Sequence, residues 1–309
     1  MSNKEQIAVI GAGLMGHGIA QVFAVAGHDV TVYDPDPQAL KTLNQRIAAN
    51  LQALGQDSKA QAGVRPTEAL AECVEEADVV IEAGPEDLPF KNRLFKQLEK
   101  IVRGDAILAS NTSVIPITQI IAGMTSAQRA LGTHWWNPPY LVPLVEVIKT
   151  EQTSPSIAQR MFDLLAAVGK TPAMVEKDVA GFIGNRLQHA LWREAVALVE
   201  AGVCSAETLD TVVKASFGRR LPVLGPLENA DLVGTDLTLA IHRTVLPAID
   251  SRPGPSPYLE QLVAEGRLGM KSALGFRSWT PEQQAELRSR VTDHLIAMDQ
   301  RDALARRQP

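Results

Sequence analysis

A strand-like run, a set of spaced glycines and a helical segment follow one another near the start of the chain. Residues 7–11 read IAVIG, a continuous apolar run typical of a strand that is buried on both faces. Glycines stand at Gly11, Gly13 and Gly16, and a helical pattern then continues to residue 26. Such a glycine pattern also occurs by chance, but between a strand and a helix it is typical of a turn that binds the phosphates of a dinucleotide.

Asp34 ends a second strand-like run, DVTVYD, at the place where dinucleotide-binding units carry an acid for the ribose. Its carboxylate can accept hydrogen bonds from both ribose hydroxyls but would repel a 2′-phosphate. No arginine follows in residues 35–37, so we predict NAD rather than NADP. The N–H groups at the start of the helix would hold the pyrophosphate, and we expect His17 on the helix surface. The cofactor contacts predicted in this segment are Gly11, Gly13, Leu14, Met15, Gly16 and Asp34.

Up to Gly181, short apolar runs rich in β-forming residues alternate with helical segments. We expect strands at residues 6–11, 29–34, 78–83, 106–110, 129–134, 144–148 and 171–177. Alternation of this kind predicts a Rossmann-type α/β fold, that is, a doubly wound, mostly parallel sheet with helices on both faces.

After Gly181 the strand pattern ends and helical periodicity takes over. Ser205 has the character of a helix N-cap, and Pro281 that of a first helical residue. Helices are expected at residues 182–202, 205–217, 237–249 and 281–307. The sequence therefore predicts two domains, an α/β domain at residues 1–183 and an all-helical C-terminal domain at residues 184–309.

Composition argues against several classes of protein. The 309 residues carry a net charge of −5, which disfavours a general attraction to nucleic acid or anionic lipid. No apolar run approaches the ~20 residues that span a bilayer, and the two cysteines have no spacing for a disulfide framework or a zinc site. We expect a cytoplasmic protein with a small-molecule substrate and with no nucleic acid, membrane or metal partner.

Polar side chains stand at the ends of the later apolar runs, where open α/β sheets bind their ligands. His134 ends one such run, and Glu146 stands inside the run LVEVI, where a buried carboxylate requires a partner. Histidine is the side chain best suited to proton transfer near neutral pH. Because successive strand residues point to opposite faces, only one of Trp135 and Trp136 can face a substrate pocket.

Several motifs resemble successive signatures of the 3-hydroxyacyl-CoA dehydrogenase family. They are GAGLMGHGIAQ at residues 11–21, SNTSVIPI at 110–117, GTHWWNPPYLVPLVEVI at 132–148, GFIGNR at 181–186 and LPVLGPLENADLVG at 221–234. The resemblance covers most of the chain and implies catalytic roles for His134, Glu146, Ser113 and Asn185. It also implies cofactor contacts at Glu86, Lys91, Asn111, Asn137 and Lys271, the last in a loop where Ala273 replaces the usual glycine.

The reaction that this resemblance implies interconverts a 3-hydroxy and a 3-keto group. His134 would act as general acid/base, removing the hydroxyl proton as the β-carbon gives its hydride to the nicotinamide. Glu146 would fix the tautomer of the imidazole and stabilise its protonated form. Ser113 and Asn185 would donate hydrogen bonds around the reacting oxygens.

Two substrate classes remain open, a 3-hydroxyacyl-CoA and a small free 3-hydroxy carboxylate. The acyl-CoA members of the family place an extended helical hairpin, with basic contacts to CoA, after the residue that matches Asp34. Here residues 37–66 are shorter and carry few cations, chiefly Lys41, Arg46, Lys59 and Arg65. The motif His-x-x-Asn-Pro-Pro-Tyr is similar to the λ-crystallin/L-gulonate 3-dehydrogenase and pyridine-carboxylate dehydrogenase branches, which act on free acids.

Arg220 matches a place where the free-acid branch tends to carry a basic residue, and we interpret it as a clamp for a substrate carboxylate. A solvated surface arginine is the other interpretation. Two further functions also stay open: oxidation of an aldehyde or of an aromatic or cyclic carboxylate on the same scaffold, and a λ-crystallin-like structural role. The apolar stripes of the helical domain, and the pairing common in the family, predict a homodimer through that domain.

Overall fold

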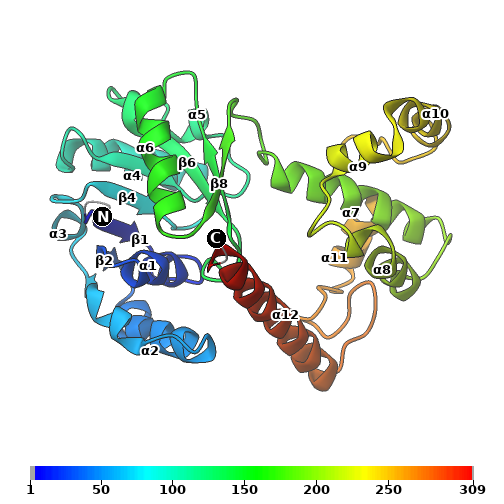
Figure 1. Cartoon of the computed structure of the whole chain (residues 1–309), viewed down its shortest axis with the longest axis horizontal. Helices are drawn as coiled ribbons and strands as arrows, with labels where there is room; N and C mark the ends of the chain where they lie inside the picture. Colours follow the sequence, from blue (N-terminus) through cyan, green and yellow to red (C-terminus); the bar gives the residue numbers. More distant parts are fainter. Residues whose placement is uncertain (1–3, 308–309) are drawn as a thin grey trace. The chain divides into compact units, whose positions relative to one another are not determined.

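A computed structural model of the chain describes residues 4–307, and its described part contains one eight-stranded sheet (Figure 1). The strands are β1 (Gln6–Ile10), β2 (Asp29–Tyr33), β3 (Val64–Thr67), β4 (Val79–Glu82), β5 (Ile107–Ser110), β6 (Ala130–Trp135), β7 (Leu144–Ile148) and β8 (Thr171–Val175). Their order in the sheet is β3-β2-β1-β4-β5-β6-β7-β8, and every neighbouring pair is parallel except β6 with β7. This confirms the predicted doubly wound, mostly parallel sheet.

Helices connect the strands, and helices joined by loops form the described residues after β8, which confirms the predicted fold class. Between the strands lie α1 (Gly16–Val25), α2 (Pro37–Ala53), α3 (Leu70–Val74), α4 (Leu88–Ile101), α5 (Ile117–Ile120) and α6 (Pro155–Ala167). After the sheet come α7 (Gly184–Glu200), α8 (Ala206–Ala215), α9 (Pro226–Val233), α10 (Thr235–Val245), α11 (Pro257–Ala264) and α12 (Pro281–Arg307).

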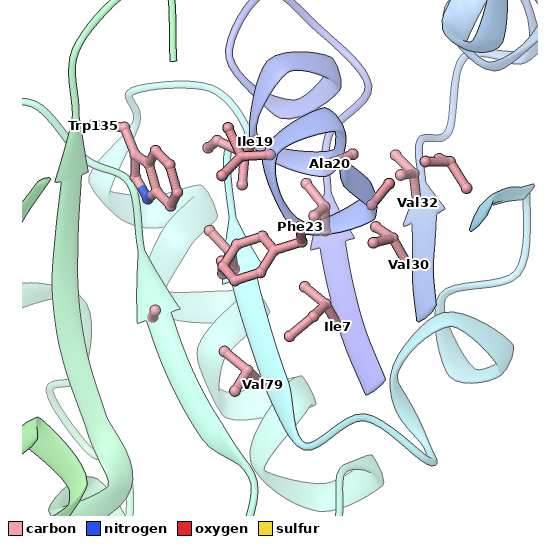
Figure 2. Close-up of a cluster of buried hydrophobic side chains, with 14 of the residues drawn as sticks. Ile7, Ile19, Ala20, Phe23, Val30, Val32, Val79 and Trp135 are labelled. Carbon is pink, nitrogen blue, oxygen red and sulfur yellow. The ribbon is translucent and has the colours of Figure 1, made fainter. Parts of the chain in front are cut away.

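Alternate residues of each strand enter two separate hydrophobic cores, one on each face of the sheet. Ile7 and Val9 of β1 belong to the core that α1, α2 and α6 cover. Ala8 and Ile10 belong to the core that α3, α4 and α5 cover. Figure 2 shows the first of these cores, where Phe23 of α1 lies over the strands. Burial on both faces explains why these strands are apolar throughout rather than alternating.

Strand β3 was missing from the sequence prediction. It has four residues, VRPT, and Pro66 within it cannot donate a hydrogen bond to a second neighbouring strand. The structure places β3 at one edge of the sheet, where it pairs with β2 alone. Before it, residues 37–63 form the single helix α2 and a short 3₁₀ segment, Ser58–Gly63.

The chain divides into two compact units. One holds the described residues up to Arg186 and those from His294 onward, and the other is Leu187–Asp293. Ser205 caps α8 by accepting a hydrogen bond from the Thr208 N–H at 3.2 Å, as the sequence predicts. The outer ends of the two predicted domains, residues 1–3 and 308–309, lie outside the described residues.

Within residues 4–307, no helix is both long and apolar enough to cross a bilayer. The same residues contain no cluster of three or more histidine, cysteine or acidic side chains arranged to hold a metal ion.

Candidate active site at the carboxyl ends of the strands

The three glycines between β1 and α1 serve different purposes. Gly11 has φ +105°, and a Cβ there would lie 2.6 Å from the Ala83 carbonyl oxygen. A Cβ on Gly16 would lie 1.7 Å from the Gly11 carbonyl oxygen, so no side chain fits. A Cβ on Gly13 would meet no atom within 4 Å, so the backbone is open there to an approaching ligand. Two glycines thus pack the turn and the third leaves room for a pyrophosphate, which fits a bound dinucleotide.

Arg46 of α2 holds the carbonyl groups of this loop. Its guanidinium donates to the Ala12 oxygen at 2.6 Å and to the Gly13 oxygen at 3.3 Å. The imidazole Nδ1 of His17 lies 2.9 Å from the same Gly13 oxygen. In a trans peptide the C=O and the N–H point in opposite directions. With the Ala12 and Gly13 carbonyls held toward these side chains, the N–H groups of the same peptides point away from them. Arg46 and His17 therefore orient the loop.

His17 is buried, so its predicted place on the helix surface is wrong. Tyr140 lies nearby, with the two ring centroids 6.5 Å apart. Burial lowers the pKa of His17 and outweighs the hydrogen bond to the Gly13 carbonyl, which raises it. Every residue of α1 from Gly16 to Ala24 is buried, so this part of the helix has no exposed face for His17 to occupy.

Asp34 lies directly beyond β2, and its carboxylate is held by backbone amides. One oxygen accepts a hydrogen bond from the Ala12 N–H at 2.7 Å, and the other accepts from the Asp36 N–H at 2.9 Å. The side chain is only partly buried. Each carboxylate oxygen keeps a second lone pair, so the group can still accept hydrogen bonds from a ribose.

A buried salt bridge joins Lys91 of α4 to Glu82 at the end of β4. The Lys91 ammonium donates to both Glu82 oxygens, at 2.7 and 2.8 Å. The Ser110 hydroxyl and the Gly84 N–H complete the shell of the carboxylate, at 2.6 and 2.8 Å. Both charged side chains are 1% exposed. Lys91, which the sequence predicts as a cofactor contact, is thus almost completely enclosed by protein.

Glu86 is the exposed acid beside this salt bridge, and its carboxylate lies 3.5 Å from the Lys91 ammonium. One oxygen accepts hydrogen bonds from the Thr112 hydroxyl at 2.6 Å and from the Ser113 N–H at 2.9 Å. Burial alone would raise its pKa, but the hydrogen bonds and Lys91 together lower the pKa below that of an ordinary glutamate. Glu86 is therefore a fixed negative charge at the rim of the site.

His134 and Glu146 face each other across β6 and β7. They are register partners in this antiparallel pair, and the His134 Nδ1 lies 2.7 Å from one Glu146 oxygen. Directly opposed residues on antiparallel strands have their side chains on the same face. Both side chains are buried. With Nδ1 donating to the carboxylate, Nε2 is the ring nitrogen that remains for other partners.

The second oxygen of Glu146 faces the start of α7. It accepts hydrogen bonds from the Ile183 N–H at 2.9 Å and the Gly184 N–H at 3.0 Å. Burial raises the pKa of Glu146, but the hydrogen bonds from His134 and from the two amides outweigh it, so the pKa lies below its ordinary value. A helix N-terminus favours a negative charge in the same way. Glu146 is thereby held as a carboxylate.

Three further predicted site residues, Asn111, Asn137 and Asn185, lie directly after β5, shortly after β6 and in the first turn of α7. Asn111 follows β5, and its side-chain oxygen accepts a hydrogen bond from the Trp135 N–H at 3.0 Å. The Asn185 amide donates to the Ser113 carbonyl at 2.7 Å, which ties the start of α7 to the loop after β5. Asn137 is exposed just beyond β6. The structure thus brings Ser113 and Asn185 together.

Arg220 and Lys271 lie in the second unit, Leu187–Asp293, and both are exposed. Arg220 follows a short 3₁₀ turn, Phe217–Arg219. The loop of Lys271 contains Ala273 with φ +59°, a left-handed conformation that glycine adopts more easily. Ala273 therefore holds this conformation at a cost in strain.

Comparison with protein-family models decides the family. Residues 6–179 match the NAD-binding domain of 3-hydroxyacyl-CoA dehydrogenase, and residues 181–279 match the C-terminal domain. The chain belongs to the 3-hydroxyacyl-CoA dehydrogenase family. It is an NAD-dependent oxidoreductase, as the glycine loop and Asp34 predict.

Relatives of this dehydrogenase are named for different substrates. It is 36% identical over 94% of its length to 5-formyl-3-hydroxy-2-methylpyridine 4-carboxylate 5-dehydrogenase of Mesorhizobium japonicum, covering 96% of that protein. It is 39% identical over 88% of its length to a probable 3-hydroxybutyryl-CoA dehydrogenase of Bacillus subtilis, covering 96% of that protein. A crystal structure of a dehydrogenase of the first kind is described as that of an NAD⁺-dependent dismutase. It superposes with a TM-score of 0.89 at 34% identity, and the match covers 96% of this chain and 97% of the chain in the crystal structure.

Several residues of the dehydrogenase site were missed at the sequence level. Glu82 was not singled out, although an acid that ends the buried run VVIE, nine residues before a lysine, is a detectable signal. Arg46 was counted only as a free cation. The amides of Ile183 and Gly184 left no sequence signal, because backbone donors depend on where α7 begins rather than on residue type.

Proposed function

We propose that this family member is an NAD-dependent dehydrogenase of a small free carboxylate rather than of an acyl-CoA. The cations after Asp34 carry this proposal. Arg46 is used by the glycine-loop carbonyls, and Arg65 by Glu72 and by Thr31. The segment also contains a single helix before its 3₁₀ turn. Two of the four cations are thus already paired within the protein, which leaves little charge for the phosphates of CoA.

His134 is the general acid/base of the proposed reaction. Glu146 occupies Nδ1, so Nε2 exchanges a proton with the substrate oxygen. Bound NAD supplies the acceptor for the hydride of the carbon that bears this oxygen. Glu146 fixes the tautomer and stabilises the imidazolium that forms, while the two amides at the start of α7 keep it ionised. Ser113 and Asn185 donate hydrogen bonds near the reacting oxygens.

A second candidate reaction uses the same groups on a different carbon. The relative from Mesorhizobium is named for a formyl group on a pyridine carboxylate. An aldehyde hydrate carries a hydroxyl whose proton His134 could remove as the carbon loses hydride, so the same residues serve both reactions. This relative aligns with 94% of the chain, against 88% for the Bacillus subtilis relative, which favours this candidate over an acyl-CoA substrate.

The experiment is a comparison of NADH oxidation with acetoacetyl-CoA, free acetoacetate and longer 3-keto acids, and of NAD⁺ reduction with pyridine carboxaldehyde carboxylates. His134→Ala is the blank. A rate that depends on His134 with free carboxylates supports the proposal. A rate that depends on His134 with the thioester alone overturns it and assigns the enzyme to acyl-CoA substrates.

Arg220 is proposed as the clamp for the substrate carboxylate, and Lys271 as a further cofactor contact. A guanidinium can bind a carboxylate through two parallel hydrogen bonds. Arg220→Ala should raise the KM of the carboxylate substrate at least tenfold, whereas the neighbouring Arg219→Ala should leave it unchanged. Equal KM values for both variants would assign Arg220 to the solvated surface.

A homodimer through the helical domain, residues 184–309, is also proposed. Helices α7, α8, α9 and α10 bury no residue within a single chain. Leu227 and Leu232 are 79% and 73% exposed, and amphipathic helices with uncovered apolar residues favour association. Light scattering should give the mass of a dimer.

A cytoplasmic location is also proposed, because the two cysteines, Cys73 and Cys204, are both free thiols, as is usual in a reducing compartment.

A further inference from the structure

Trp136 and Gly184 occupy one space beside the His134–Glu146 pair. A Cβ on Gly184 would lie 2.5 Å from Cζ2 of Trp136, closer than atoms of this kind approach one another. It would also lie 3.4 Å from the Glu146 oxygen that binds His134. The indole therefore fills the volume that a side chain at residue 184 would need, and it does so against the first atoms of α7.

The other side of this arrangement is the imidazole itself. The ring centroids of His134 and Trp136 are 5.2 Å apart, and those of His134 and Phe182 are 5.6 Å apart. Neither aromatic residue is held there by a polar contact of its side chain. The Trp136 Nε1 is buried and has no hydrogen-bond partner among the described residues, so packing alone sets the orientation of the indole.

The backbone before α7 is strained in a way that serves the same pair. Gly181 has φ +74°, and Phe182, which is not a glycine, has φ +51°. A bulky residue in the left-handed region costs about 1–3 kcal/mol and persists only where its surroundings enforce it. This conformation places the Phe182 ring near His134 and is followed at once by the two amides that bind Glu146.

We propose that Trp136 is a positioning residue for the His134–Glu146 pair, and that residue 184 is glycine because the indole occupies its side-chain space. The indole presses the start of α7 into register with Glu146 and keeps water from the pair, since a side chain at 184 would displace either the indole or the helix. This inference rests on the proposed general acid/base role of His134 for its effect on turnover. Its structural part does not depend on that role.

The test is a size exchange across the contact. The variants are Trp136→Phe, Gly184→Ala and the double variant W136F/G184A, with Gly104→Ala and Trp192→Phe as matched controls. A Cβ on Gly104 meets no atom within 4 Å, and Trp192 is half exposed on α7. Thermal unfolding and the Kd of NAD⁺ by calorimetry establish that each variant is folded and that the glycine loop is intact.

Two measurements report on the pair. With a substrate identified by the NADH-oxidation and NAD⁺-reduction assays, each single variant should lower kcat about 10- to 100-fold without changing the KM of NAD⁺, as a displaced catalytic group does. The double variant should regain most of that loss, because the smaller ring makes room for the methyl group.

Without any substrate, the Nδ1 proton of His134 should give a far-downfield ¹H resonance in a ¹⁵N-histidine-labelled enzyme. Each single variant should shift or lose it, and the double variant should restore it.

Two results would overturn the inference. One is single variants that keep both kcat and the resonance. The other is a double variant whose fold-loss in kcat equals the product of the two single fold-losses. If no compound tested is turned over, the proposed function fails, while the resonance still decides whether Trp136 and Gly184 hold the pair.

Discussion

Two buried acid–base pairs lie on the same sheet, and their environments differ in one respect. Lys91 with Glu82 is closed on all sides, because the ammonium, a hydroxyl and an amide fill the carboxylate shell. Glu146 accepts three hydrogen bonds, from His134 and two amides, against four for Glu82. Its histidine partner, however, has a second ring nitrogen.

Under the proposed function, this difference separates a structural pair, Lys91 with Glu82, from a reactive one, His134 with Glu146. Lysine brings only donors, and the charged Lys91 ammonium, held by Glu82 and beside Glu86, has no lone pair with which to take up a proton. Histidine passes a proton through one nitrogen while the other stays bound. The same carboxylate chemistry thus fixes α4 to β4 at one place and orients the proposed base, His134, at the other.

The largest effect should come from breaking the reactive pair. Glu146→Gln leaves an amide opposite His134, so the imidazolium is no longer stabilised and either tautomer is accepted. We expect kcat to fall by about 10²- to 10⁴-fold with little change in the KM of NAD⁺. Steady-state kinetics measure this, with Glu176→Gln, an acid of a surface salt bridge with Lys149, as the control. Equal kcat in both variants would contradict the role given to Glu146.

Breaking the structural pair should affect folding instead. Lys91→Met leaves the Glu82 carboxylate buried without its cation, which costs about 3–5 kcal/mol of the free energy of unfolding. Urea unfolding measures this, and the double variant K91M/E82Q should recover part of the loss because it removes the uncompensated charge. A loss below about 1 kcal/mol, the size of a surface pair, would show that the pair is not closed as described.

The smallest effect should be the pH dependence of stability. The pKa of Glu146 is lower in the folded chain than its ordinary value of 4.5, so protons favour the unfolded chain. This contribution is fully present above pH 4.5 and is lost as the pH falls through the folded pKa. Glu146→Gln should therefore unfold with a weaker dependence on pH below 4.5 than the native chain. If the stabilities of the variant and the native chain fall in parallel below pH 4.5, the acid-sensitive group lies elsewhere. Glu86 is then the next candidate, because its pKa is also lowered.

The pattern of apolar residues predicted most of the sheet, because strands buried on both faces are continuous apolar runs in the sequence. All seven predicted runs contain strands of the structure, and β3 was missed because Pro66 and its short length hide it. The short helices α9 and α11 were also missed, although Pro226 and Pro257 each start one directly. Eight-residue helices carry too few turns for a periodic pattern.

The chemistry of the site was predicted less completely than the fold. Sequence could propose that His134 and Glu146 cooperate, because an acid inside an apolar strand needs a partner. It could not place Lys91 inside the protein rather than at its surface, nor show that Arg46 is used by the glycine loop. Both outcomes depend on distances between elements far apart in the chain, and no local pattern encodes them.

The antiparallel pairing of β6 with β7 has a consequence for engineering. His134 and Glu146 meet because the backbone ladder makes them direct partners, which places their side chains next to each other on the same face of the sheet. A slip of one residue between the two strands would turn every side chain of one strand to the opposite face and destroy the pair. A designer who wants an oriented histidine in a new protein can therefore begin with one antiparallel hairpin of fixed register, and then add a helix whose first amides point at the carboxylate.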